Sequence, residues 1–142
     1  MAEVTASETR HVTAVAIGGR AVLIEGPSGA GKSDLALRLI DRGATLVSDD
    51  YTLLTREDDR LVARAPQTIA GRMEVRGLGI VTVAHLLCAP VGLLVRLSAQ
   101  VERMPEPAAQ VIVGVTIPLI TLNGLEASAP IKVELALART GN

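Results

Sequence analysis

Two β-branched apolar runs near the start of the chain are separated by a pair of glycines. The first run covers residues 11–17, the second covers residues 20–25, and Gly18-Gly19 lies between them. Short apolar runs joined by a two-residue glycine turn are typical of a β-hairpin. The pattern therefore predicts two adjacent antiparallel strands in this region.

A glycine-rich loop, residues 26–31, follows the predicted hairpin, and a helical pattern follows the loop. Within residues 32–42 the apolar side chains recur at a spacing that places them on one face of a helix, and Gly43 stands where a helix commonly ends. Asp34 and Arg38 are four residues apart on the opposite face, where they can pair. The apolar positions of this predicted helix are Leu35, Ala36, Leu39 and Ile40.

The rest of the chain consists mainly of short apolar runs separated by turns, which predicts further strands. Residues 66–76 have no clear pattern, residues 84–87 allow a short helix, and residues 130–139 are predicted to form a last helix that Pro130 opens. The order of strand, loop, helix and then many strands predicts an α/β fold with a mainly β sheet and a few helices. The predicted strands after the first helix cover residues 45–48, 51–55, 61–64, 79–83, 91–97 and 111–117.

The length of 142 residues is sufficient for one domain, and we expect residues 1–10 to form an N-terminal tail before a single domain over residues 11–142. Fourteen basic and fifteen acidic residues give a net charge of -1, which argues against nucleic-acid and membrane-surface partners. Aromatic residues make up 1% of the chain, too few for base-stacking platforms. We therefore expect a cytoplasmic domain with an aliphatic core.

The chain has one cysteine, Cys88, so an intrachain disulfide or a cysteine zinc site is excluded. We expect Cys88 to be buried as a small apolar side chain. Residues 77–95 and 107–125 lack charged side chains, but glycine, proline and polar residues interrupt both segments. These two segments predict buried strands rather than membrane spans.

Residues 26–33 read Gly-Pro-Ser-Gly-Ala-Gly-Lys-Ser and match the phosphate-loop pattern G-x-x-x-x-G-K-[ST]. In such a loop the backbone N–H groups converge on a phosphate, and the following helix adds its positive end. Lys32, which we expect to be exposed, can reach the β- and γ-phosphates, and the Ser33 hydroxyl can bind Mg²⁺. The motif predicts a P-loop-containing nucleotide-binding domain in which the nucleotide contacts Gly26, Pro27, Ser28, Gly29, Ala30, Gly31, Lys32 and Ser33.

Asp49 and Asp50 follow the predicted strand over residues 45–48. Ligand sites of α/β sheets gather at the carboxyl ends of strands, so this position is expected to face the nucleotide. Two carboxylates there can hold Mg²⁺ or accept a proton from an attacking hydroxyl. An exposed turn can also contain such a pair, but the phosphate loop favours the catalytic interpretation. The sequence does not distinguish the roles of the two aspartates.

Glu74 and Arg76 open the stretch Glu-Val-Arg-Gly-Leu-Gly-Ile, residues 74–80. In an extended segment the acid and the guanidinium lie on one face, and the two glycines permit a close backbone approach. A surface salt bridge beside a β-turn explains the same spacing equally well. His11 and His85, taken alone, are interpreted as structural histidines.

Three motifs in this order, residues 26–33, residues 42–50 and residues 74–80, resemble the catalytic domain of the HPr kinase/phosphorylase family. In that family a histidine precedes the phosphate loop by about the distance that separates His11 from Gly26. The resemblance covers residues 11–97. The stretch over residues 74–80 carries most of the weight, because general P-loop proteins lack it.

The resemblance implies a bacterial cytoplasmic protein kinase that uses ATP and Mg²⁺ to phosphorylate a serine of HPr, the phosphocarrier of the sugar phosphotransferase system. It also implies that the reaction can run backwards with inorganic phosphate, and that the protein is a homo-oligomer, since the family forms hexamers. Ser33 and Glu74 would hold Mg²⁺, and either Asp49 or Asp50 would be the base. The implied catalytic centre consists of His11, Lys32, Asp49, Asp50 and Arg76.

The chain departs from the family in two places. We expect a short form with the catalytic domain only, because about ten residues precede the first predicted strand. Residues 117–126 stand where the family has a Pro-Gly-Arg-Asn stretch, and they contain no arginine. Arg76 is the better substitute and Lys132 the second, so we expect a slow kinase with weak or no reversal.

Two other functions are compatible with the same loop. One is another P-loop phosphotransferase, and the other is an ATP-sensing regulatory module with little catalysis. A GTPase is not expected, because the chain contains no Asn-Lys-x-Asp guanine-reading motif.

Overall fold

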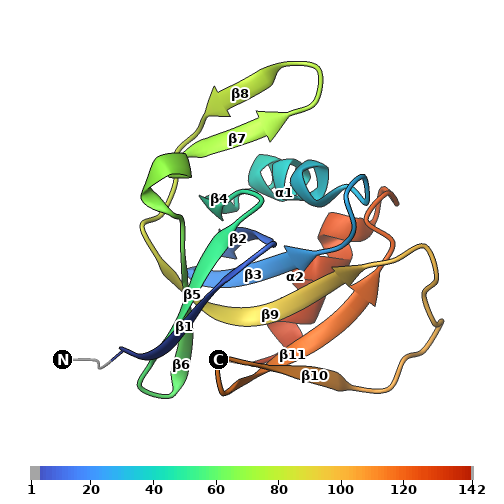
Figure 1. Cartoon of the computed structure of the whole chain (residues 1–142). Helices are drawn as coiled ribbons and strands as arrows, with labels where there is room; N and C mark the ends of the chain where they lie inside the picture. The colour runs from blue at the N-terminus through green and yellow to red at the C-terminus, as the bar shows by residue number, and fades with distance from the viewer. Residues whose placement is uncertain (1–3, 142) are drawn as a thin grey trace.

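A computed structural model describes residues 4–141 of the chain. These residues form a large mixed sheet, a separate two-stranded hairpin and two α-helices (Figure 1). The helices are α1 (Lys32–Asp41) and α2 (Ala129–Arg139), with a 3-10 turn over Gln67–Ile69. The strands are β1 (Val4–Arg10), β2 (Thr13–Ile17), β3 (Arg20–Glu25), β4 (Thr45–Ser48), β5 (Thr52–Glu57), β6 (Arg60–Arg64), β7 (Arg72–Val75), β8 (Gly79–Thr82), β9 (Ala89–Leu97), β10 (Ala108–Ile112) and β11 (Val115–Leu122).

The large sheet has the strand order β1-β5-β6-β9-β3-β2-β4, and the hairpin of β10 and β11 joins it through β9. β9 pairs in parallel with both β3 and β11, whereas β2 is antiparallel to both β3 and β4. β4 therefore runs in the same direction as β3. As a result, β11, β9, β3 and β4 all end at one edge of the sheet, which is where α/β sheets place their ligand sites.

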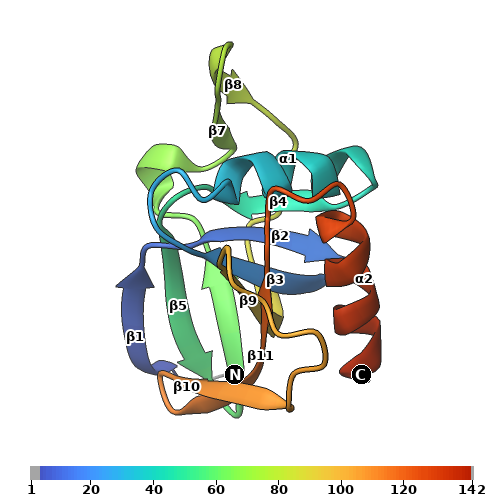
Figure 2. The same ribbon diagram turned by 90° about the vertical axis from the view of Figure 1, so that its right-hand side faces the viewer.

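The central strand β3 is buried on both faces. Val22 and Ile24 point into the core that α1 and α2 cover, and Ala21 and Leu23 point into a second core that β5, β6, β10 and β11 enclose. Figure 2 shows the helices and the curved outer strands on different sides of β3. Burial on both faces explains why this run is continuously apolar rather than alternating. The result confirms a mixed α/β fold with a mainly β sheet.

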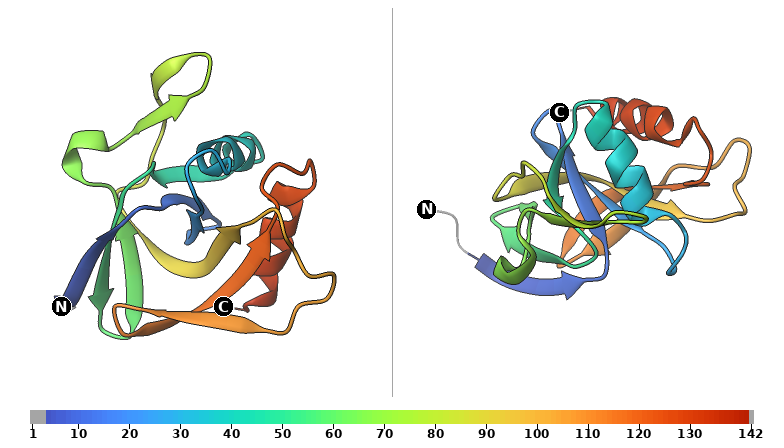
Figure 3. Two further views of the ribbon diagram at one scale, coloured as in Figure 1. Left: turned by 45° about the vertical axis from the view of Figure 1, so that its right-hand side comes forward. Right: turned by 90° about the horizontal axis from the view of Figure 1, so that it is seen from above.

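The β7–β8 hairpin stands away from the rest of the molecule (Figures 1 and 3). Met73 anchors its base in the core beneath α1 and is 1% exposed. At the tip, by contrast, Leu78 is 76% exposed and Ile80 is 64% exposed. The predicted strand over residues 79–83 is thus present, but the expectation that it is buried is wrong, because it pairs with β7 outside the large sheet.

Residues 1–10 were expected to be a tail, and this is wrong for the part that the structure describes. Residues 4–10 form β1, which pairs antiparallel with β5 from Val4↔Glu57 to Arg10↔Thr52. The segment is mostly polar and carries no apolar periodicity, so its backbone pairing with an edge strand had no signal in the sequence. His11 follows β1, and the next strand begins at Thr13.

Three smaller predictions also fail. Residues 111–117 are not one strand, because a turn at Val113 (φ 50°) and Gly114 (φ 79°) separates β10 from β11. Residues 84–87 form no helix, and His85 instead makes an isolated bridge to Leu46. Cys88 is exposed rather than buried, since it lies in the connection before β9.

The last helix, predicted over residues 130–139, is confirmed as α2. No helix within residues 4–141 is long and apolar enough to cross a membrane.

Candidate active site

The glycine-rich loop joins the end of β3 to the start of α1. Gly29 (φ 86°) and Gly31 (φ 92°) have left-handed backbone conformations that strain residues with a side chain. Gly31 is the N-cap residue of α1, and its carbonyl accepts the first helical hydrogen bond from the Leu35 N–H at 2.9 Å. The N–H groups of the first helical turn have no carbonyl partner within the helix. The loop therefore offers backbone donors to an anion.

Lys32 is the first residue of α1 and is 8% exposed. Its Nζ donates to the carbonyl oxygen of Gly26 at 2.8 Å and to that of Pro27 at 3.4 Å. The expectation of an exposed lysine is therefore wrong, because the side chain folds back so that its ammonium contacts two carbonyl oxygens of the loop. The ammonium group of Lys32 is thus bound by carbonyl oxygens of the same loop.

Asp49, directly after β4, is 6% exposed and joins three segments of the chain. Its Oδ1 accepts hydrogen bonds from Ser33 Oγ at 2.7 Å and from Thr13 Oγ1 at 3.1 Å. Its Oδ2 accepts the backbone N–H of Glu74 at 3.1 Å. One buried carboxylate thus connects α1, β2 and β7.

Asp50 has a different environment from its neighbour. Its backbone is left-handed (φ 70°), a conformation that aspartate tolerates better than most residues, and its N–H donates to Thr13 Oγ1 at 3.1 Å. Its side chain is 55% exposed and lies 2.6 Å from His11 Nε2, measured to Oδ1. The His11 ring stacks on Tyr51, with ring centroids 4.8 Å apart. His11 and Asp50 therefore form an exposed pair at the same strand end.

Glu74 and Arg76 lie on and just beyond β7, and both are exposed. The structure brings the Glu74 backbone to Asp49, but Arg76 makes no side-chain hydrogen bond or ion pair within residues 4–141. In the same described range, no three His, Cys, Asp or Glu side chains gather as a metal-binding group. Lys132, the second candidate for the missing cation, pairs instead with Glu126 at 3.2 Å.

The sequence patterns did not predict two sets of residues near the loop. Thr13 is fully buried and bonds both aspartates, but a threonine in a β-branched strand carries no signal of such a role. Glu25, the last residue of β3, pairs with Arg96 at 2.6 Å and with Arg10 at 3.3 Å. These arginines meet Glu25 only in the folded protein, where residues of β1 and β9 lie beside the end of β3.

The family comparison matches this chain to the HPr Serine kinase C-terminal domain over residues 2–91. That range is more than half of the chain and contains the loop, both aspartates and residues 74–80. The chain therefore belongs to the HPr serine kinase C-terminal domain family.

Individual relatives agree with this assignment. The chain is 46% identical over 87 residues to an HPr kinase/phosphorylase of Clostridium beijerinckii and 49% identical over 80 residues to one of Bacillus subtilis. These alignments cover 61% and 56% of this chain but 29% and 26% of the relatives, so the chain spans less than a third of their length.

A solved structure is similar over almost the whole chain. The HPr(Ser) kinase/phosphatase from Coxiella burnetii matches with a TM-score of 0.80 and 31% identity, and the match covers 93% of this chain and 94% of that one. The similarity therefore extends beyond residue 91, into the part that the family model does not match.

Proposed function

We propose that this chain is an ATP- and Mg²⁺-dependent protein serine kinase that acts on an HPr-like phosphocarrier protein. The observation that carries the proposal is the position of Asp49. Its carboxylate accepts hydrogen bonds from Ser33, in the phosphate-loop motif, and from the Glu74 backbone, in the motif over residues 74–80. All three sequence motifs thus meet at one carboxylate, and the family assignment supports the same activity.

The glycine-rich loop fits a triphosphate. Its left-handed glycines and the unpaired N–H groups at the start of α1 form an anion-binding concavity, and the Lys32 ammonium lies against the same loop. In this proposal the domain is a P-loop nucleotide-binding domain. Lys32 exchanges its carbonyl partners for phosphate oxygens when the nucleotide binds.

The oxygen groups beside the loop fit Mg²⁺, which prefers hydroxyl, carboxylate and phosphate ligands. Ser33 and Glu74 are our assigned protein ligands, and Asp49, 2.7 Å from the Ser33 hydroxyl, holds that hydroxyl in position. Bound Mg²⁺ neutralises negative charge on the transferred phosphoryl group. The chain's own contribution is to orient the ligands.

Transfer to a serine requires a group that accepts the hydroxyl proton. The Asp49 oxygens already accept hydrogen bonds from Ser33, Thr13 and the Glu74 backbone, and the carboxylate is buried. The His11–Asp50 pair is half exposed, so a protein substrate can reach it. We therefore assign proton acceptance to the His11–Asp50 pair and a positioning role to Asp49.

Arg76 is our assignment for the cation that stabilises the transferred group. Its guanidinium is exposed on the hairpin next to Glu74 and has no carboxylate partner within the described residues. An arginine held in place by a carboxylate is costly to redirect, whereas an unpaired one can turn to a phosphoryl group. Because residues 117–126 lack the arginine that the family resemblance implies there, we expect a slow kinase with weak or no reversal.

The oligomeric state and the cellular location that we propose are those that the family resemblance implies. We expect a cytoplasmic protein that forms a homo-oligomer, with the hexamer as the family's precedent. Size-exclusion chromatography with light scattering measures the assembly directly.

The test of the activity uses the intact chain with γ-labelled ATP, Mg²⁺ and the host's HPr-like protein. We expect label on one serine of the phosphocarrier, and no label when that serine is replaced by alanine. The Asp50→Asn variant provides the matched inactive enzyme. A chain that binds ATP but labels no phosphocarrier would contradict the proposal and favour an ATP-sensing module.

A further inference from the structure

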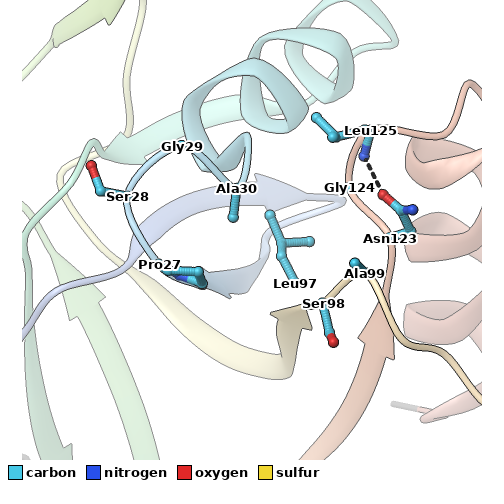
Figure 4. Close-up of a pocket in the computed structure, with 10 residues that line it drawn as sticks. All are labelled: Pro27, Ser28, Gly29, Ala30, Leu97, Ser98, Ala99, Asn123, Gly124 and Leu125. Carbon is cyan, nitrogen blue, oxygen red and sulfur yellow. Dashed lines mark hydrogen bonds between the residues drawn. The ribbon is translucent and has the colours of Figure 1, made fainter.

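A groove lies directly beside the glycine-rich loop, with a volume of about 270 Å³ (Figure 4). Residues 27–30 of the loop, residues 97–99 at the end of β9 and residues 123–125 after β11 line it. Its volume is near the lower end of small-molecule sites, which span about 300–1,000 Å³. Because the loop itself is one wall, a molecule bound in the groove would touch the site assigned to the triphosphate.

The strand order places the groove and the two aspartates, Asp49 and Asp50, on opposite sides of the loop. β3, which carries the loop, lies between β9 and β2, and β4, which carries the aspartates, lies beyond β2. β11 pairs with the opposite edge of β9. Along this edge of the sheet, the spatial order is therefore the ends of β11 and β9 with the groove, then the loop after β3, and then the aspartates after β4.

This order decides the direction of a bound nucleotide. The reacting end of a triphosphate must lie near Ser33 and the His11–Asp50 pair, because proton acceptance and the proposed metal ligand are there. With the phosphates in the loop, the other end of the molecule extends away from β4. The groove beside the ends of β9 and β11 lies on that side.

The lining of the groove has the chemistry of a nucleoside site. Leu97 supplies a buried apolar floor, and Leu125 is an apolar side chain that is 71% exposed at the rim. Gly124 lets the two segments meet, because a Cβ at this position would lie 2.9 Å from Leu97 Cδ1. A sugar and a base present both flat apolar surface and polar edges, and this combination matches mixed pockets.

Two polar side chains in the groove are oriented by the backbone. Asn123 Oδ1 accepts the Leu125 N–H at 3.0 Å, as the dashed line in Figure 4 marks, and this contact leaves the amide NH2 group to donate elsewhere. Ser98 Oγ accepts the Gln100 N–H at 3.1 Å, so its hydroxyl proton is likewise available as a donor. Both donors suit hydroxyl or ring-nitrogen acceptors.

We propose that this groove binds the nucleoside portion of ATP, between the glycine-rich loop and residues 97–99 and 123–125. The inference rests on the proposed function, because it assumes that the loop binds a triphosphate. It gives a role to the segment after β11, which lacks the arginine that the family resemblance led us to expect there. That segment shapes the nucleoside site.

The competing position for the base is the exposed Tyr51 ring, which stacks on His11. Aromatic stacking favours bases in general. A base at Tyr51, however, would occupy the side where the substrate hydroxyl must reach the His11–Asp50 pair. The experiments below separate these two positions.

The first experiment compares two ligands, Mg-ATP and inorganic tripolyphosphate, by calorimetry on the full chain. Ala99→Trp fills the groove from an exposed position, and Ala138→Trp, on the outer face of α2, is the matched control. We expect Ala99→Trp to weaken ATP binding about tenfold or more while tripolyphosphate binding changes by less than about twofold. Leu125→Ala shortens a side chain that is 71% exposed, and it should weaken ATP binding in the same selective way.

The outcomes separate this inference from the proposed function. If the unmodified chain binds neither ligand, both the inference and the proposed function are wrong. If it binds ATP and tripolyphosphate equally, or if Ala99→Trp and Leu125→Ala leave ATP affinity unchanged, the groove inference alone is wrong.

The second experiment locates the base directly with 8-azido-ATP and peptide mapping of the labelled chain. We expect the label within residues 97–99 or 123–125, and competition by unlabelled ATP. Label at Tyr51 or His11 would overturn the inference.

Discussion

The candidate site has a buried half and an exposed half, and Asp49 and Asp50 represent them. Asp49 is 6% exposed and receives three hydrogen bonds from three segments. The Asp50 side chain is 55% exposed and contacts one histidine. Adjacent residues in a chain can thus have separate physical tasks when a left-handed turn directs the second one outward.

This difference in burial predicts which property each half of the site affects, the stability of the fold or the chemistry. A buried carboxylate that satisfies donors from several segments contributes to both folding and positioning, and its loss leaves those donors unpaired. An exposed pair contributes little to folding, so its replacement should change chemistry alone. The buried half consists of Thr13, Lys32 and Asp49, with the partly buried Ser33 beside them, and the exposed half consists of His11, Asp50, Glu74 and Arg76.

The largest effect is expected from Asp50→Asn. Removing the proton acceptor should lower phosphoryl transfer by about 10²- to 10⁴-fold. The melting temperature and ATP affinity should stay at the parent values, because the side chain is exposed. Quenched-flow transfer assays and calorimetry measure the two quantities. Asp59→Asn, in the exposed β5–β6 turn, is the control. Full activity in Asp50→Asn would make the pair an ordinary turn.

Lys32→Ala should act on binding rather than on chemistry. We expect Mg-ATP affinity to fall by about 10²-fold, because the variant loses the positive charge that lies against the loop. The Gly26 and Pro27 carbonyls remain at a solvent-accessible loop, so the fold should persist. Arg60→Ala removes an exposed cation elsewhere and should bind ATP normally. Parental affinity in Lys32→Ala would contradict the phosphate-loop assignment.

Arg76→Ala should lower transfer by about tenfold or more while ATP affinity stays unchanged, since the assigned arginine acts on the transferred group only. Arg72→Ala, at the start of the same hairpin and also exposed, controls for a general effect on the hairpin. Steady-state kinetics with the phosphocarrier give both values. Unchanged turnover in Arg76→Ala would exclude it as the substitute cation. Efficient phosphate-dependent reversal by the parent would contradict our expectation of weak reversal.

The smallest catalytic effect is expected from Thr13→Val, and its main effect is on stability. The change keeps the shape but removes one donor to Asp49 and one acceptor for the Asp50 N–H. We expect the free energy of unfolding to fall by about 1–3 kcal/mol. Thr82→Val, on the exposed face of β8, should be nearly neutral in the same urea titration. A neutral Thr13→Val would show that the buried network does not stabilise the fold.

Much of the central structure followed from local patterns. The hairpin of β2 and β3, helix α1 and strand β4 lie close to their predicted positions, because their apolar periodicity reports burial directly. Helix α2 was predicted from Pro130, because proline is tolerated in the first turn of a helix. Two of the failures, the polar β1 and residues 84–87, are segments without periodicity. The apolar run over residues 111–117 failed for another reason, because a turn at Val113 and Gly114 divides it into two strands.

The site could be predicted as a set of residue types but not as an arrangement. The phosphate-loop spacing selected residues 26–33 and the strand-end rule selected both aspartates as candidates, and the structure brings Ser33 and Asp49 together. Nothing in the spacing separated Asp49 from Asp50, since their difference depends on a backbone angle and on Thr13, a residue of another strand. The burial of Lys32 was also not predicted, because it depends on how the loop folds over the lysine side chain.

The sequence by itself determined the mixed α/β class, the glycine-rich loop and the family resemblance, because these depend on residues that are neighbours in the chain. The tertiary structure decided which distant segments meet. It joined Ser33, Thr13 and Glu74 at one carboxylate, and it placed residues 97–99 and 123–125 beside the loop. Parallel pairing of β3, β9 and β11 brings these segments together, and parallel strands pair across long connections that no local pattern records.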